Sequence, residues 1–98
     1  FNMEISGTLT VDDGAAKALI DGKKSLLAAG VTSSIGAFAQ GDAVSIHNKS
    51  GKEIGRGISN YTSEEIDKIK GMKTSEIRKL FDDTFYEEVI HRDNMIIF

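Results

Sequence analysis

The sequence has no cysteine among its 98 residues. This absence excludes a disulfide framework and a zinc site built on thiolate ligands. It is compatible with a reducing compartment, and we expect the protein to be cytoplasmic. Long apolar stretches are also absent, because no run approaches the roughly 20 residues that a membrane-spanning helix needs. We therefore expect no membrane partner.

An excess of basic residues is missing as well. The formal net charge is −3, from 12 basic and 15 acidic residues. Residues 1–61 hold six acidic and six basic side chains, so the whole negative balance lies in residues 62–98. Proteins that bind nucleic acid mainly through its phosphates normally carry a basic excess. The charge balance therefore argues against strong non-specific binding to nucleic acid.

A complete phosphate-binding loop is absent too. The segment GRGISN has Gly55 and Gly57 in the pattern G-x-G-x-x-G, but Asn60 stands where the third glycine belongs. Glycines spaced by two are also typical of a strand in which another backbone approaches closely or the chain bends. We favour this structural interpretation, and a nucleotide site at Gly55–Asn60 is the weaker alternative.

The strand interpretation also accounts for the residues between the glycines. Ile54, Arg56 and Ile58 share one face at a period of two, and we expect that face to be the interior. An arginine between two core residues needs a carboxylate partner. Asp42 and Asp93 are the candidates.

Other catalytic motifs fail on spacing. A Walker A loop ending in GKKS at 22–25 would need a glycine at Lys17. HRDN at 91–94 lacks the spacer and the companion motifs of a protein-kinase catalytic loop. His47 and His91 have neither a metal-binding spacing nor cysteines beside them. We expect no catalytic residue, no cofactor-binding residue and no metal ligand in this chain.

The patterns that are present predict a small, mainly β domain. Alternation over residues 7–11 predicts a half-buried strand, followed by a helix of about two turns capped by Asp12 or Asp13 and ended by Gly22. Short β-like runs separated by turns follow, with a hairpin turn at 48–52. One domain of this length builds a small core but no deep cleft.

The C-terminal third predicts two helices and a closing strand. Thr62 and Glu65 form a capping box, and Gly71 ends that helix. A second short helix begins near Thr74, and residues 86–98 return to β character. The expected barrel interior is Leu9, Val11, Leu19, Val31, Phe38, Val44, Ile46, Ile54 and Ile58. The residues expected to pack the later helices are Ile66, Ile69, Ile77 and Leu80.

The sequence has one basic cluster beside a glycine turn. Lys17 lies on the first predicted helix, and Lys23 and Lys24 follow it. A solvated helix C-terminus favours cations, which explains the cluster without a ligand. A weak contact with an anion or RNA is the alternative, and the sequence leaves both open.

Residues 7–80 resemble the PUA domain, a small β-barrel module. The matching residues are Val11, Asp12, Gly14, Ala15, Leu19, Gly22, Gly30, Val31, Phe38, Gly41, Asp42, Val44, Gly51, Ile54 and Gly57. The resemblance implies an α+β fold that is mainly β with short helices, a PUA-like pseudo-barrel of short mixed strands. Residues 7–98 would form this domain and its closing strand, and residues 1–6 would be the remnant of a linker from an upstream kinase domain.

The tail narrows the resemblance. IKG at 69–71, SEI at 75–77 and EVIHRDN at 88–94 resemble the C-terminal segment of the bacterial glutamate 5-kinase family. These enzymes phosphorylate L-glutamate with ATP in proline biosynthesis. The resemblance implies that ATP and Mg²⁺ bind in an amino-acid-kinase domain outside this chain. This chain would then be a non-catalytic module that acts on its own kinase domain or on homo-oligomer assembly.

RNA-binding relatives of the PUA domain imply an alternative role as an RNA-binding module. Their contacts gather around the first helix, the following glycine turn and the next strand. The corresponding surface for RNA or a protein partner here is Gly14, Ala15, Lys17, Lys23, Lys24, Ser25, Gly30 and Val31.

Overall fold

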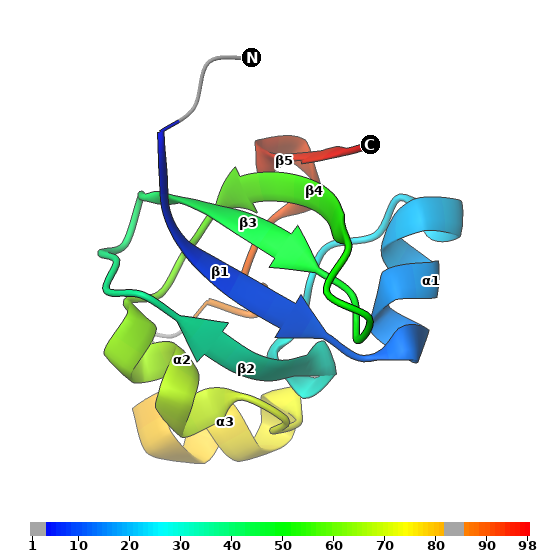
Figure 1. The fold of residues 1–98 in the computed structure, drawn as a ribbon. Coiled ribbons are helices and arrows are strands. Elements are labelled where there is room, and N and C mark those ends of the chain that lie inside the picture. The colour runs from blue at the N-terminus through cyan, green and yellow to red at the C-terminus, as the bar shows by residue number, and fades with distance from the viewer. Residues whose placement is uncertain (1–3, 82–85) are drawn as a thin grey trace.

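The protein is built on one mixed five-stranded sheet. The structure, a computed structural model, describes residues 4–81 and 86–98. The strands are β1 (Ile5–Val11), β2 (Val31–Ile35), β3 (Ala43–His47), β4 (Glu53–Ile58) and β5 (Met95–Ile97). They are ordered β2-β1-β3-β4-β5, with β1 and β3 parallel and the other pairs antiparallel (Figure 1). The predicted α+β class with short mixed strands is confirmed.

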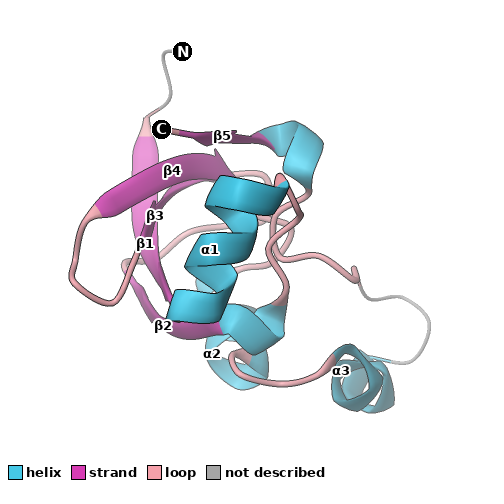
Figure 2. Cartoon of the chain, turned by 90° about the vertical axis from the view of Figure 1, so that its right-hand side faces the viewer, coloured by secondary structure: helices cyan, strands magenta, loops and turns pink. Residues whose placement is uncertain are grey.

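Three short helices flank the sheet. They are α1 (Asp13–Gly22), α2 (Ser63–Ile69) and α3 (Thr74–Phe81). Single 3₁₀ turns, η1 (Ala28–Gly30) and η2 (Arg92–Asn94), precede β2 and β5. Helix α1 runs beside the sheet from the end near β2 to the end near β5, and α2 lies next to β2 (Figures 1 and 2). The first helix therefore extends between the two edges of the sheet, which β2 and β5 form.

Strand β1 begins earlier than the resemblance implied. It starts at Ile5, so Ile5 and Ser6, two of the residues assigned to a linker, lie within β1. Residues 1–3 of that expected linker lie outside the described residues. The early start extends β1 alongside β3, where Ile5 pairs with Ala43.

Helix α1 follows β1 directly because Asp12 caps it. The Asp12 carboxylate accepts from the Ala15 N–H at 2.7 Å. At the other end the prediction that Gly22 closes the helix is wrong by one residue. Gly22 is still helical, and Lys23 has the left-handed backbone, with φ at 50°. Lysine tolerates this conformation at a cost of about 1–2 kcal/mol, so the glycine position alone could not fix the helix end.

The interpretation of GRGISN as a strand is confirmed. Gly55 and Gly57 lie in β4, where a Cβ on Gly55 would sit 2.5 Å from the Ile96 carbonyl oxygen. The Ser59 N–H donates to the Asp42 carbonyl at 2.9 Å, and the Asn60 N–H donates to the Val89 carbonyl at 2.8 Å. Amides that would cradle a phosphate are thus bonded to the protein's own backbone.

A bulge in β4 changes which face each residue occupies. Ile46 pairs with Gly55 but His47 pairs with Glu53, so Ile54 is an extra residue. The glycines, rather than Arg56, therefore face the interior beside the fully buried Ile46. The prediction that Arg56 and Ile58 share the interior face with Ile54 is wrong, because the bulge interrupts the period of two.

Most of the predicted core is confirmed, with two exceptions. The predicted interior is buried apart from Ile58, which is half-buried on the outer face of β4. Leu80 was expected to pack α3 but is 57% exposed. In α3 the inward positions are Ile77 and Phe81, four residues apart, and Leu80 is turned away from them. Among the larger hydrophobic side chains that the structure describes as buried, the sequence patterns missed Leu26, Tyr61, Val89 and Ile90.

The capping box of α2 supports a first prediction. The Glu65 N–H donates to Thr62 Oγ1 at 3.1 Å, and the Thr62 N–H donates to Glu65 Oε1 at 2.8 Å. We expect Thr62→Ala to lower the free energy of unfolding by about 1 kcal/mol, because it removes the acceptor for an unpaired helix amide. Urea denaturation measures the change. Thr62→Ser keeps the acceptor and serves as the control, and an equal loss in both variants would contradict the capping role.

Candidate functional site

Five of the eight residues predicted as a partner surface line one groove. Gly14 and Ala15 come from the first turn of α1, and Lys24, Ser25 and Gly30 come from the segment that follows the helix. The groove has a volume of about 320 Å³. We call it the glycine groove, and its lining is Asp12, Gly14, Ala15, Ala18, Leu19, Lys24, Ser25, Leu26, Leu27, Ala29 and Gly30.

Tight packing fixes the shape of the glycine groove. A Cβ on Gly30 would lie 2.5 Å from the Ala15 Cβ, so this position has room only for glycine. The Asp12 N–H donates to the Gly30 carbonyl at 2.9 Å, which ties the start of α1 to η1. Leu27 remains 44% exposed at the groove. The groove is thus a preformed, mostly apolar surface with a lysine at its edge.

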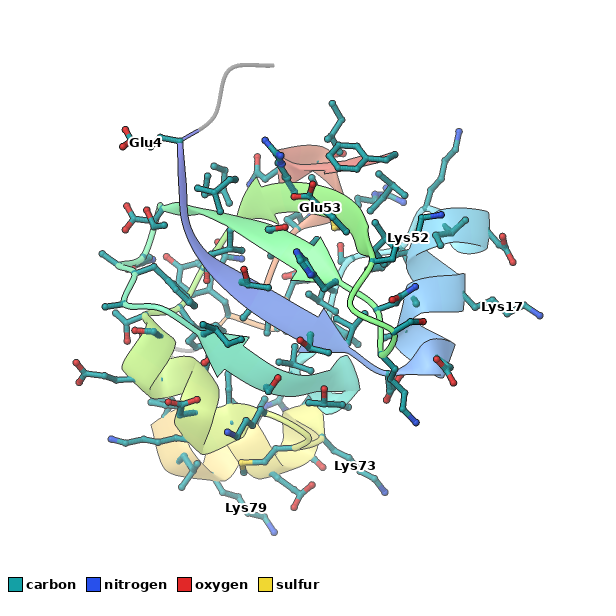
Figure 3. The ribbon with its side chains drawn as sticks, viewed as in Figure 1. Glu4, Lys17, Lys52, Glu53, Lys73 and Lys79 are labelled. Atoms are coloured by element: carbon teal, nitrogen blue, oxygen red, sulfur yellow. The ribbon has the colours of Figure 1, made fainter. Side chains whose placement is uncertain are left out.

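The other three predicted residues lie elsewhere. Lys17 points away from the sheet on the outer side of α1 (Figure 3). Val31 is 1% exposed, so its side chain belongs to the core, and it does not line the groove. Lys23 lies at the C-terminal end of α1. Lys73 and Lys79 project at the far end of the molecule and do not join these cations (Figure 3).

A second groove lies between the C-terminal end of α1 and β5. It has a volume of about 330 Å³. We call it the β5 groove, and its lining is Leu19, Ile20, Lys23, Lys24, Arg92, Met95, Ile96, Ile97 and Phe98. Lys24 lines both grooves. The sequence did not indicate this second groove.

Arg92 is the residue that sequence reasoning missed. Its backbone N–H donates to Ser25 Oγ at 2.9 Å, a contact between residues 67 positions apart. The contact brings Arg92 to the lysine pair after α1, so three cations line one groove. The only signal was the tail segment EVIHRDN, which contains Arg92 but indicates nothing about its position in space.

A polar cluster lies on the outer face of β3 and β4. Arg56 Nε donates to Glu53 Oε2 at 2.9 Å, and Ser45 donates to the same oxygen. His47 Nε2 is 2.9 Å from Ser45 Oγ. Figure 3 shows the position of Glu53 on β4. The Arg56 guanidinium also lies 5.7 Å from the centre of the Phe98 ring.

The partner of Arg56 differs from both candidates. Glu53 pairs with it because the bulge at Ile54 turns Glu53 and Arg56, three residues apart, to the same face. Asp42 instead accepts from the Ala39 N–H at 2.8 Å. Asp93 lies at 3.6 Å from His91 Nδ1. The predicted pairing with Asp42 or Asp93 is wrong.

The cluster contains Ser, His and Glu but lacks the arrangement of a catalytic triad. A nucleophilic serine needs a histidine base that a carboxylate orients. Here Glu53 contacts Ser45 and Arg56, and Ser45 itself is only 5% exposed. The hydrogen bond from Arg56, followed by that from Ser45, holds the pKa of Glu53 below its usual value. The cluster fixes β3 against β4, and we assign it a structural role.

The lowered pKa gives a second prediction. A carboxyl group whose pKa is lower in the folded state stabilises the fold above its unfolded-state pKa, and this contribution disappears as the pH falls through the folded-state pKa. We expect Glu53→Gln to reduce the urea midpoint at neutral pH and to match the wild type in strong acid. Glu87→Gln, at an exposed carboxylate, is the control. A pH-independent difference for Glu53→Gln would contradict the assignment.

Two further features are absent from the described residues. Within residues 4–81 and 86–98, no three His, Asp or Glu side chains are grouped so that they could hold a metal ion. None of the helices in these ranges has the length and apolar character to cross a bilayer.

Comparisons with known proteins agree on one family. The protein-family model described as the PUA domain matches residues 7–81. The chain is 59% identical over 95 residues to a glutamate 5-kinase of Aquifex aeolicus, and 52% identical over 97 residues to one of Thermoanaerobacter sp. (strain X514). These matches cover 97% and 99% of this chain but only 26% of either relative. The chain thus spans about a quarter of the length of the curated relatives it matches.

Solved structures give the same fold. A PUA domain from Aeropyrum pernix, solved as a tartrate complex, has a TM-score of 0.65 and 25% identity. That match covers 89% of this chain and 41% of the other. An archaeal box H/ACA sRNP Nop10-Cbf5 complex matches with a TM-score of 0.56 and 20% identity, over 64% of this chain and 20% of the other, and shows the fold alone.

Proposed function

This chain belongs to the PUA domain family, and from that premise we propose that it is the non-catalytic C-terminal domain of a cytoplasmic glutamate 5-kinase. The parent enzyme would transfer phosphate from ATP to the γ-carboxylate of L-glutamate, with ATP and Mg²⁺ bound in its kinase domain. The observation that carries the proposal is the similarity to glutamate 5-kinases along 97–99% of this chain.

The described part of the chain supports the non-catalytic role. The glycine pair that resembles a phosphate loop lies inside β4, and the neighbouring amides are bonded to Asp42 and Val89. In the Ser45 cluster the carboxylate of Glu53 bonds Ser45 and Arg56 and does not orient His47, so the arrangement of a catalytic triad is not formed. The domain would therefore modulate the kinase domain, or the assembly of the enzyme, through its surface.

The direct test has two parts. The isolated chain, supplied with ATP, Mg²⁺ and L-glutamate, should form no glutamyl phosphate, which hydroxylamine trapping detects. A full-length glutamate 5-kinase such as the Aquifex aeolicus relative should change its kinetic parameters or its oligomeric state when the matching domain is deleted. Activity of the isolated chain would refute the non-catalytic role. Unchanged kinetics and assembly after deletion would refute the accessory role.

RNA binding is the second candidate function, and the glycine groove favours it. The groove combines an exposed backbone at Gly14 with an exposed leucine and a lysine, and relatives that bind RNA imply contacts at this position. RNA affinity should fall as the salt concentration rises, and Lys24→Ala should reduce the slope of log affinity against log salt by about 1. Lys79→Ala, at the far end of the molecule, is the control (Figure 3). Absence of RNA binding at low salt would end this candidate.

A further inference from the structure

The β5 groove shares Lys23 and Lys24 with the surface that the family resemblance implies, but its β5 wall and Arg92 are used by neither the resemblance nor the proposed function. Strand β5 is at the edge of the sheet, where it pairs with β4 alone in the described part of the chain. An edge strand presents N–H and C=O groups on which another strand can be built. The groove beside it contains three cations and no acidic residue, although the whole chain has a net charge of −3.

The groove follows the backbone of β5. Side chains of a strand alternate between its two faces, and those of Met95 and Ile97 pack against the core while those of Ile96 and Phe98 are exposed. All four residues nevertheless line the groove. The feature they share is the strand edge, so the groove runs along that edge.

The hydrogen-bond register shows which backbone groups of β5 are not bonded to β4. The Phe98 N–H donates to the Ile54 carbonyl at 2.9 Å, so this pair is bonded across β4 and β5. Bonded and non-bonded pairs alternate in an antiparallel ladder, so Ile96 also bonds with β4. Met95 and Ile97 therefore direct their N–H and C=O groups away from β4, and both residues line the groove.

The other wall of the groove has the chemistry of a specificity surface. Ile20 is 49% exposed on the last turns of α1, opposite the exposed Ile96. Lys23 and Lys24 follow directly, and Arg92 is held beside them by its bond to Ser25. The acidic neighbours of these residues in the sequence, Asp21 and Asp93, do not line the groove.

We propose that the β5 groove binds an extended acidic polypeptide segment, which adds a strand to β5, places aliphatic side chains against Ile20 and Ile96, and pairs its carboxylates with Lys23, Lys24 and Arg92. Strand addition of this kind takes affinity from main-chain bonds and specificity from alternate side-chain pockets. The inference goes beyond the proposed function, because it holds whether the segment belongs to the kinase domain or to another protein.

The same observations disfavour other occupants. A second copy paired through β5 would bring two sets of three cations together, and that repulsion is costly. A nucleic acid strand needs aromatic platforms for its bases, and the groove is mainly aliphatic. Phe98 is its one aromatic side chain, and the Arg56 guanidinium already lies over that ring.

The first test measures peptide binding to the 98-residue chain. The probe is an end-blocked, fluorescein-labelled seven-residue peptide that alternates glutamate with valine, and its control replaces every glutamate with lysine. We expect saturable binding of the acidic peptide only. Reversing the charge of Lys23 or Arg92 to glutamate should weaken it about 5-fold each, the upper range for an exposed ion pair. Lys17→Glu, on the outer side of α1, should leave binding unchanged (Figure 3).

The second test examines the main-chain bonds without altering the protein. N-methylation of alternate peptide amides removes donors on one edge of the added strand, so one set should abolish binding and the other set should retain it. Amide hydrogen exchange should slow at Met95 and Ile97 on binding, while Ile96 and Phe98 are already paired. Equal effects of the two methylated sets, or no change at Met95 and Ile97, would overturn strand addition.

Three further outcomes would overturn the proposal. The first is equal affinity for the lysine peptide, and the second is a dimer of the chain alone that the acidic peptide dissociates. The third is competition for the groove by single-stranded RNA that depends on Arg92. If deletion of the domain proves to have no effect on glutamate 5-kinase, these peptide measurements still test the groove. Failure of the inference and failure of the proposed function can therefore be told apart.

Discussion

Gly55→Ala is expected to lower the free energy of unfolding by about 1–3 kcal/mol, because the new methyl group has no space. Its Cβ would lie 2.5 Å from the Ile96 carbonyl oxygen and 2.8 Å from Ile97 Cδ1. The first of these atoms belongs to the backbone of β5, so relief requires the closing strand to move. Urea denaturation should show the loss, and hydrogen exchange should show faster opening at β5.

Two other glycines calibrate this prediction. At Gly57 the nearest backbone atom is the Asn94 carbonyl oxygen at 3.1 Å, and the nearest atom of any kind is Ile90 Cγ2 at 2.6 Å, so the backbone is less crowded than at Gly55 and Gly57→Ala should cost less. At Gly14 the nearest atom is Asp12 Oδ1 at 3.5 Å, and alanine is the better helix former. Gly14→Ala should therefore be neutral or stabilising by up to about 1 kcal/mol. A loss at Gly14 equal to that at Gly55 would show that steric contact is not the cause.

Ile77→Ala is expected to lower the free energy of unfolding by about 2–5 kcal/mol, because it leaves a cavity in the core. Ile77 is 2% exposed and belongs to the main hydrophobic cluster. Leu80→Ala, in the same helix, removes a side chain that is 57% exposed and should change stability by less than about 0.5 kcal/mol. Both changes place alanine in a helix, so helix propensity favours neither variant strongly.

This pair of variants tests how α3 is oriented on the domain. The sequence pattern places Ile77, Leu80 and Phe81 on one helical face. In the structure Phe81 packs near Tyr61, with ring centres 6.3 Å apart, and Leu80 lies outside the contact. A large loss for Leu80→Ala, comparable to that for Ile77→Ala, would contradict this orientation of α3.

The two grooves share helix α1 and Lys24 but differ in what they can bind. The glycine groove lies at the start of the helix, next to η1, and the β5 groove lies at its end, next to an open strand edge. Substitutions of residues that line only one groove therefore separate the functions of the two grooves. Leu27 belongs to the glycine groove, and Arg92 and Ile96 belong to the β5 groove. Lys24→Ala alone cannot distinguish RNA binding from peptide binding.

Several elements could be predicted from the sequence because their causes are local. The cap at Asp12 and the box of Thr62 with Glu65 depend on residues within three positions of each other. The hairpin at 48–52 needs only Asn48 and Gly51, whose N–H donates to the Asn48 carbonyl at 3.0 Å. The PUA resemblance supplied the fold class, and the family match confirms it.

The strands, the helices and the two N-terminal caps follow from local sequence patterns, and so does the position of Gly55 and Gly57 in a strand. Long-range packing is needed to pair Glu53 with Arg56, to turn the glycines toward the core and to bring Arg92 to the lysines after α1. The physical reason is the range of the interactions. Periodicity and capping act between near neighbours, whereas one bulged residue reverses a strand face and a contact across 67 residues depends on how the sheet closes.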